Sequence, residues 1–195
     1  YFIGETIGIS HTTASESGVF LACIPVVSLL ASTVILHKKP SKRQVLGILI
    51  TLVGVLVTVL VVGISSSLSV VGYLFLVIAV ISYALYSVFV QKASDYTEVE
   101  ITYVMLAAGA VVFTILSIAE SFFKGNLNLL LILPLKDTNF LIAILYQGIG
   151  CSVIAFFLSN MAIARIGVNR TSSFIGVSTV VSIISGAILL QESFS

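Results

Sequence analysis

Charged side chains are scarce in this sequence. Of its 195 residues, 9% are charged, while 58% are hydrophobic and the mean hydropathy is +1.21. An average soluble domain carries about 25% charged residues. So few charges cannot coat the surface of a 20.7 kDa globule, and lipid must replace the missing polar coat. The composition excludes a water-soluble globular protein and predicts an integral membrane protein.

Features typical of other protein classes are also lacking. A formal net charge of +1 excludes a nucleic-acid-binding protein that neutralises many phosphates. The two cysteines, Cys23 and Cys151, lie in apolar runs, which excludes a disulfide framework and a paired-cysteine metal site. His11 and His37 are isolated from each other, so we expect no metal and no cofactor. The chain has no initiator methionine and opens at Tyr1 in helix-like sequence, so we expect a fragment of a longer protein.

Long apolar runs are what the sequence has in place of charge. A helix needs about 20 residues to cross a hydrocarbon core of roughly 30 Å. Six runs without Asp, Glu, Lys or Arg meet that length: Ser17–Leu36, Val45–Val62, Val71–Val90, Ile101–Ala119, Phe140–Ala164 and Thr171–Leu190. The runs are continuously apolar, whereas the strands of a membrane barrel alternate, so helices are favoured. The predicted fold class is an all-α, polytopic transmembrane helix bundle.

Two shorter apolar segments accompany these spans. Tyr1–Ser10 is expected to be the exit end of a further span. Asn126–Leu135 is too short to cross and contains Pro134, so it is expected to be interfacial or re-entrant.

The loops between the spans differ in basic charge. The loops at 37–43, 91–100 and 165–170 together carry seven Lys and Arg residues, and the alternate loops carry two, Lys124 and Lys136. The positive-inside rule therefore places the three basic loops in the cytoplasm. We expect a multi-pass protein of the plasma membrane, or cell inner membrane.

The beginning and the end of the chain resemble each other. Phe2–Ser41 aligns without a gap with Phe156–Ser195, with eight identities over 40 positions, and Val-Val-Ser recurs at 26–28 and 180–182. Five crossings separate the matched helices, so the second copy must cross in the opposite sense. Such inverted-topology repeats are typical of many secondary transporters.

Several segments resemble the EamA-type domains of the drug/metabolite transporter superfamily. In the first half of the chain the segment is Gly18–Gly54, which contains Pro25, the polar turn Ser41-Lys-Arg-Gln44 and the stretch Gly47-Ile-Leu-Ile-Thr-Leu-Val-Gly54. In the second half the segments are Gly72–Lys92, which contains Ser82-Tyr-Ala-Leu-Tyr86, then Leu145–Arg165 and Gln191-Glu-Ser-Phe-Ser195. Two positions depart from the family pattern. His37-Lys38-Lys39 replaces the acidic residue after the fourth helix, and Thr179 replaces the proline of the ninth.

The resemblance implies ten helices in two inverted repeats of five. This chain would supply the end of the third helix through the ninth. Residues 1–63 would then be the C-terminal part of the first repeat, 64–70 a connecting loop, and 71–195 the second repeat without its last helix.

Polar side chains within the spans are the candidate pathway residues, because in lipid such groups face protein or a water-filled cavity. Tyr83 and Tyr86 offer aromatic faces well inside a span, and Gln147 and Asn160 offer amides. The hydroxyls of Ser28, Ser178 and Ser182 occupy related positions in the two repeats. The alternative for each hydroxyl is helix packing, for which small residues at four-residue spacing are common.

Two further residues carry specific expectations. Pro25 removes a backbone hydrogen bond in mid-span and should kink its helix, either beside a pathway or only for packing. Glu5 is the one carboxylate within a membrane helix. It is either a proton site, because burial favours the protonated form, or an interfacial residue one turn from the loop.

The sequence therefore predicts a permease that moves a small organic solute, with export favoured, by alternating access between inverted repeats. Metalloprotease, nucleophile-elbow and P-loop motifs are lacking, so we expect no enzyme. The alternative is a structural or assembly subunit whose helices only pack. Expected partners are the bilayer and the solute, without nucleic acid. Homodimerisation through the 45–62 helix is a further expectation.

Overall fold

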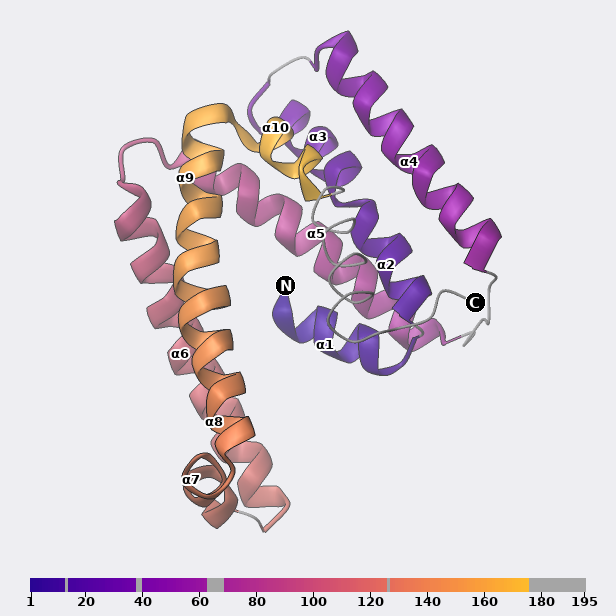
Figure 1. The fold of residues 1–195 in the computed structure, drawn as a ribbon. Helices are drawn as coiled ribbons and strands as arrows, with labels where there is room; N and C mark the ends of the chain where they lie inside the picture. Colours follow the sequence, from indigo (N-terminus) through magenta and orange to yellow (C-terminus); the bar gives the residue numbers. More distant parts are fainter. Residues whose placement is uncertain (13, 38–39, 63–68, 126, 176–195) are drawn as a thin grey trace. The chain divides into compact units, whose positions relative to one another are not determined.

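A computed structural model describes residues 1–12, 14–37, 40–62, 69–125 and 127–175. Every regular element within these ranges is helical, which confirms the all-α prediction (Figure 1). The helices are α1 (Phe2–Ser10), α2 (Ala14–Ala22), α3 (Ile24–Ile35), α4 (Lys42–Val62), α5 (Val70–Lys92), α6 (Glu98–Phe123), α7 (Leu127–Lys136), α8 (Thr138–Leu145), the π-helix η1 (Tyr146–Ala155), α9 (Phe156–Ile166) and α10 (Val168–Ser173).

Among the described residues, four helical segments are long and apolar enough to cross a membrane: Ser17–Ile35, Val70–Lys92, Glu98–Phe123 and Thr138–Ile166. They coincide with four of the six predicted runs. The predicted run Val45–Val62 lies on α4, a helix of 21 residues. The run Thr171–Leu190 lies mostly outside the described residues. The chain is thus a polytopic helical membrane protein, as predicted.

The long helices begin where their sequences offer capping side chains. Ser69 Oγ accepts from Gly72 N at 3.1 Å at the start of α5. A reciprocal capping box joins Thr97 and Glu100 at the start of α6. Ser41 and Gln44 exchange the same pair of bonds before α4. Each cap satisfies backbone N–H groups that have no partner within the helix, so the starts of these helices are fixed by local sequence.

The chain divides into two compact units. Unit 1 comprises residues 1–93 and 165–195, and unit 2 comprises 94–164. These units differ from the predicted division at 63 and 71, because α5 packs against α1 and α3. The predicted repeat boundaries remain a prediction.

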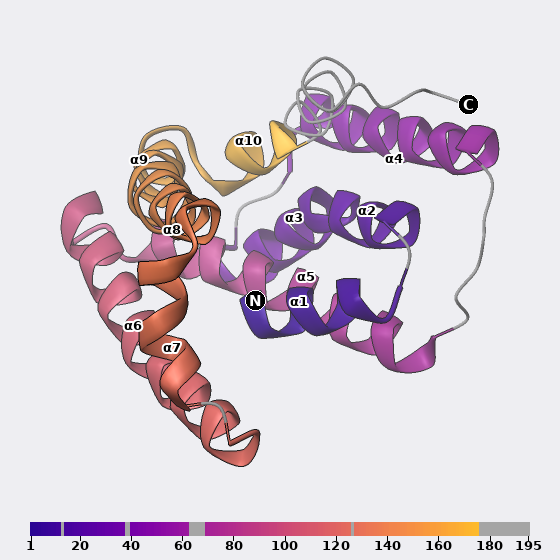
Figure 2. The same cartoon turned by 60° about the horizontal axis from the view of Figure 1, so that its bottom comes forward.

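Unit 1 is built around α5. Helices α1 and α3 pack along it, α10 packs on α3, and α2 contacts α4 and α5 (Figures 1 and 2). The buried face of α5 includes Leu76, Ala79, Ala84 and Val88, none of which is exposed. Small residues alternate with large ones on this face, which lets neighbouring backbones approach closely.

Two glycines bring α1 onto α5. Gly4 and Gly8 are buried one turn apart. A Cβ added at Gly4 would lie 2.9 Å from the carbonyl oxygen of Phe75, and one at Gly8 would lie 2.6 Å from Leu76 Cγ. Because no side chain fits in this space, the small-xxx-small pattern of α1 sets the distance between the two helices.

The helix around Pro25 is divided into two. α2 ends at Ala22 and α3 begins at Ile24, which places Pro25 in the first turn of α3. Proline is tolerated there because an N–H in the first turn has no helical partner. The interruption thus falls at Cys23, in the middle of the candidate span Ser17–Ile35.

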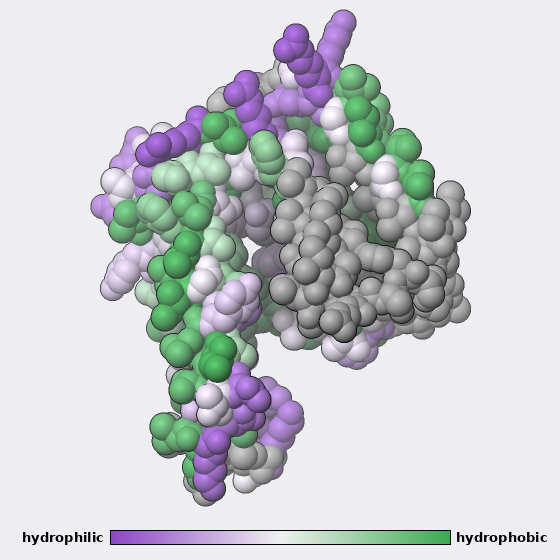
Figure 3. Space-filling view, viewed as in Figure 1, coloured by the Kyte–Doolittle hydropathy of each residue, from purple (hydrophilic) through white to green (hydrophobic). Residues whose placement is uncertain are grey.

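Unit 2 is a pair of antiparallel helical stretches. α6 runs along its length, and α8, η1 and α9 return beside it after the short α7 (Figures 1 and 2). α7 occupies the predicted interfacial segment and continues through Pro134 to Lys136. Figure 3 shows hydrophobic residues along the middle of this unit and hydrophilic residues at both of its ends. This banding fits a segment that crosses a bilayer.

A π-helix interrupts the return stretch of unit 2 between Tyr146 and Ala155. The hydroxyl of Ser152 donates to the carbonyl oxygen of Gln147 at 2.9 Å, five residues earlier. Gly148 and Gly150 have little preference for the α-helix, which lowers the cost of the wider turn. The sequence predicted an ordinary helix over 140–164, and the run of apolar residues gave no sign of this change.

The predicted loop at 165–170 is wrong in length. α9 ends at Ile166 and α10 begins at Val168, so a single residue connects them. That residue is Gly167, whose φ of 86° suits glycine and strains other residues. Because the positive φ of Gly167 is not helical, it ends α9 and turns the chain, and α10 begins at the next residue.

Candidate functional site

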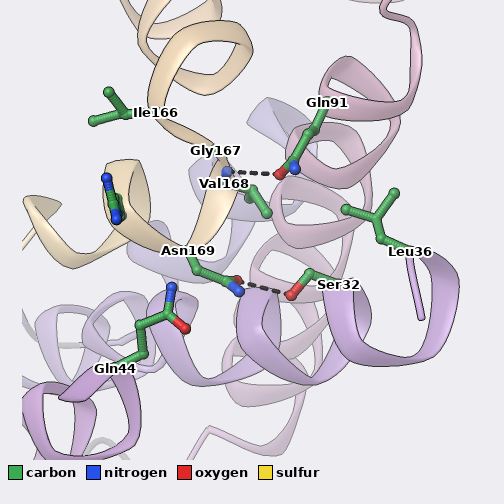
Figure 4. Close-up of a pocket in the computed structure, with 9 residues that line it drawn as sticks. Ser32, Leu36, Gln44, Gln91, Ile166, Gly167, Val168 and Asn169 are labelled. Carbon is green, nitrogen blue, oxygen red and sulfur yellow. Dashed lines mark hydrogen bonds between the residues drawn. The ribbon is translucent and has the colours of Figure 1, made fainter. Parts of the chain in front are cut away.

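A polar cavity of about 370 Å³ lies within unit 1, where the ends of α3 and α5 meet the starts of α4 and α10 (Figure 4). The described residues that line it are Ser32, Leu36, Gln44, Gln91, Ile166, Gly167, Val168, Asn169 and Arg170. Six of them lie in the predicted cytoplasmic loops at 91–100 and 165–170, and Leu36 and Gln44 flank the third predicted loop at 37–43. A polar cavity at the end of an apolar bundle is the main candidate site of this chain.

Gln91 joins α5 to the start of α10. Its Oε1 accepts from the backbone N–H of Val168 at 2.8 Å (Figure 4). Gly167 precedes α10 and has no side chain with which to cap it, so a side chain 77 residues away in sequence takes that role. Val168 is 1% exposed, so water cannot replace this acceptor.

Asn169 joins α10 to α3. The hydroxyl of Ser32 lies 2.8 Å from Asn169 Oδ1 and 2.9 Å from the carbonyl oxygen of Leu29. Ser32 is buried, and a buried hydroxyl is costly without a partner. Gln91 and Asn169 therefore hold the two sides of α10 against the bundle.

Gln44 forms the opposite side of the cavity. Its Oε1 accepts from the backbone N–H of Ser41 at 2.9 Å, as part of the cap of α4. Arg170 is the only ionisable residue among the described residues that line the cavity, and its side chain is exposed. The site thus combines amide groups with one positive charge and no carboxylate.

The predicted residues Tyr83 and Tyr86 lie elsewhere in unit 1. The rings of Tyr1 and Tyr83 are 5.2 Å apart between centroids, and those of Tyr83 and Tyr86 are 6.5 Å apart. The hydroxyl of Tyr1 donates to the carboxylate of Glu5. α1 and α5 thus bring three aromatic rings and one half-buried carboxylate together, and the role of Glu5 as a proton site stays a prediction.

Of the three predicted pathway serines, one lies within the described residues. Ser28 is completely buried on α3, and within the described part of the chain its Oγ is a buried side-chain oxygen without a hydrogen-bond partner. Ser178 and Ser182 lie outside the described residues. The pathway role of these serines stays a prediction.

The predicted amides Gln147 and Asn160 belong to unit 2. Asn160 is completely buried, and its Nδ2 donates to Thr102 Oγ1 at 3.0 Å. Thr102 in turn donates to the carbonyl oxygen of Glu98 at 2.7 Å. Gln147 lies in the π-helix with its side chain exposed. Asn160 thus ties α9 to α6, and Gln147 faces away from the packed side of its helix.

Sequence reasoning missed the four residues that define the cavity: Gln44, Gln91, Asn169 and Arg170. Each lies at the end of a span, where a polar residue is ordinary. The Ser41-to-Gln44 spacing was the one local signal, because it is typical of a capping box. The contacts of Gln91 and Asn169 join distant segments and leave no pattern in the sequence.

These observations define a polytopic helical membrane protein with a polar cavity at one end of a packed unit. The chain belongs to the EamA-like transporter family, whose pattern matches residues 1–60 and 70–195. This confirms the resemblance found in the sequence.

Relatives are found in a bacterium and an archaeon. The chain is 29% identical to "Uncharacterized transporter YcxC" of Bacillus subtilis (strain 168), over all of this chain and 63% of that protein. It is 30% identical to "Uncharacterized transporter in sor 3'region" of Acidianus ambivalens, over 92% of this chain and 67% of that protein. The chain thus spans less than two thirds of the first relative's length. No solved structure matches it.

Proposed function

We propose that the protein moves a small organic solute across the plasma membrane, most simply outward, by alternating access between two inverted repeats. The observation that carries the proposal is the polar cavity of unit 1. It lies beside the three predicted cytoplasmic loops, and its walls are amides, the charged Arg170 and apolar side chains. Membership in a transporter family supports the same conclusion.

The helix boundaries support the repeat. With the offset of 154 residues that aligns the two copies, α10 begins at Val168, which matches Ala14 of α2. The preceding helices α1 and α9 end at Ser10 and Ile166, within two residues of the same alignment. Matched breaks in matched sequence are expected if one ancestral unit supplied both copies.

The first experiment is solute flux with the full-length protein in proteoliposomes. We expect saturable uptake or release of at least one member of a panel of organic acids, amino acids and organic cations. Empty vesicles provide the baseline. Absence of flux above that baseline for the whole panel, from protein that is folded and correctly inserted, would contradict the proposal.

Variants separate transport from a purely structural role. Once a solute is found, Tyr83→Phe is expected to lower its flux about fivefold while the protein still folds, because a hydroxyl on the pathway contributes one hydrogen bond. Tyr96→Phe is the matched control, because Tyr96 is an exposed loop residue. The rival, an assembly subunit in which Tyr83 only packs, predicts loss of assembly in this variant instead.

The expected partners follow from the same account. Large hydrophobic side chains are exposed along unit 2, among them Val104, Val111, Ile115 and Ile118 of α6. We propose that lipid covers such surfaces. We also propose a homodimer through α4, because the large hydrophobic side chains of Leu46, Ile50 and Val53 are exposed there.

A further inference from the structure

We propose that the polar cavity of unit 1 binds the carboxylate group of a small organic anion. This assignment rests on the proposed function in taking that anion to be the transported solute.

Two amides of the cavity have a fixed orientation. The backbone N–H of Ser41 can only donate, so the atom of Gln44 that it meets must be the carbonyl oxygen. The backbone N–H of Val168 fixes Gln91 in the same way. Both carbonyl oxygens are therefore engaged in the fold, and the NH₂ groups of Gln44 and Gln91 remain as donors in the cavity wall.

The charge of the cavity matches this set of donors. Arg170 adds a guanidinium with up to five N–H donors. Among the described residues that line the cavity, none carries a carboxylate, and Arg170 has no ion pair in the described part of the chain. A wall of amide donors beside one unpaired positive charge favours an anionic acceptor.

The charge of the lining residues can be compared with the charge of each candidate anion. One guanidinium balances one negative charge, and a planar carboxylate can accept two parallel hydrogen bonds from it. A phosphate monoester carries close to two charges at neutral pH, of which Arg170, the one charged residue among the described residues that line the cavity, would balance one. The site therefore favours a monocarboxylate over a phosphate.

The remaining walls accommodate an apolar group. Leu36, Ile166 and Val168 line the cavity beside the amides. A cavity of about 370 Å³ is within the size range of sites for small organic ligands. An aromatic or branched aliphatic carboxylic acid fits both the donors and these walls.

Arg170 also lies in a loop whose basic charge sets topology, and that role makes a different prediction. Arg165 belongs to the same predicted loop but does not line the cavity. If the two arginines only set the topology, replacing either one has the same effect on ligand binding. If Arg170 binds the ligand, only its replacement lowers the affinity. Arg165→Gln is thus the matched control for Arg170→Gln.

The test is equilibrium binding to the full-length protein in a neutral detergent, measured by calorimetry, with benzoate, its neutral isostere benzamide, and inorganic phosphate as probes. We expect benzoate to bind at least about tenfold more tightly than benzamide, because the charge-assisted bonds are lost with the amide. We expect inorganic phosphate to bind more weakly than benzoate. Equal affinity for benzoate and benzamide, tighter binding of phosphate, or no binding of benzoate to folded protein would each overturn the assignment.

Three variants locate the site. Gln44→Glu and Gln91→Glu keep the acceptor that the backbone N–H groups need, but they replace a donor with a negative charge. Both, and Arg170→Gln, are expected to lower benzoate affinity about tenfold or more, with the unfolding temperature of Gln44→Glu unchanged. Arg165→Gln should bind like the unaltered protein. Unchanged affinity in all three cavity variants would overturn the proposal.

The experiment also separates this inference from the transport proposal. If benzoate binds at this cavity but the protein moves no solute, the binding site is supported and the transport function is contradicted. If the protein moves a solute with saturable flux but binds no carboxylate, the transport function is supported and the carboxylate site is contradicted.

Discussion

Replacing Gly8 with leucine is expected to detach α1 from α5 and to destabilise the protein by about 3 kcal/mol, the upper part of the range for overpacked sites. Gly8 is buried, and an added Cβ alone would lie 2.6 Å from Leu76 Cγ and 3.2 Å from the backbone nitrogen of Leu76. Leu76 is completely buried and has no free side on which to move. The backbones must therefore separate.

Thermal unfolding of the purified protein in detergent measures this effect, which should appear as a fall of several degrees in the midpoint. Gly109→Leu is the matched control, because a Cβ at Gly109 on α6 meets nothing within 4 Å among the described residues. A Gly8→Leu protein that unfolds at the same temperature as the control would contradict the close packing of α1 on α5.

Replacing Gln91 with leucine is expected to loosen α10. Val168 is 1% exposed, and its N–H donates to Gln91 Oε1 at 2.8 Å. Leucine offers no acceptor, so the variant leaves a buried N–H unsatisfied, at a cost of about 1–3 kcal/mol. Since Gly167 has no capping side chain, no neighbouring side chain of that connection can compensate.

Hydrogen exchange of the peptide covering residues 165–173 gives a local measurement of this effect. We expect faster exchange there in Gln91→Leu, with exchange in α6 unchanged. Gln91→Glu should restore slow exchange, because its carboxylate accepts the same bond. Equal exchange in Gln91→Leu and the unaltered protein would show that Gln91 does not hold α10.

The spans could be predicted from the sequence because they depend on local composition. Continuous apolar runs gave the helices, and capping residues such as Ser69 and Thr97 mark the starts of α5 and α6. The pair Gly4 and Gly8 also carried a local signal for close packing, although only the structure shows that α5 is the partner.

The candidate site could not be predicted because its contacts join distant parts of the chain. Ser32 and Asn169 are 137 residues apart, and Gln91 and Val168 are 77 residues apart. Neither pair has a periodicity or spacing that a local pattern could reveal. Because lipid disfavours polar groups, the sequence predicted a site at polar residues in mid-span. The cavity is instead lined by amides at the ends of the spans.

The inverted relation between the two copies is tested most directly by the side on which matched residues face water. His11 and Arg165 occupy equivalent positions at the offset of 154 residues, and both are exposed. In full-length protein with Cys23 and Cys151 replaced by alanine, His11→Cys and Arg165→Cys are each treated with a membrane-impermeant maleimide. We expect His11→Cys to react in intact cells and Arg165→Cys to react only after permeabilisation. Reaction of both variants from the same side would contradict opposite crossing of the repeats and, with it, alternating access between them.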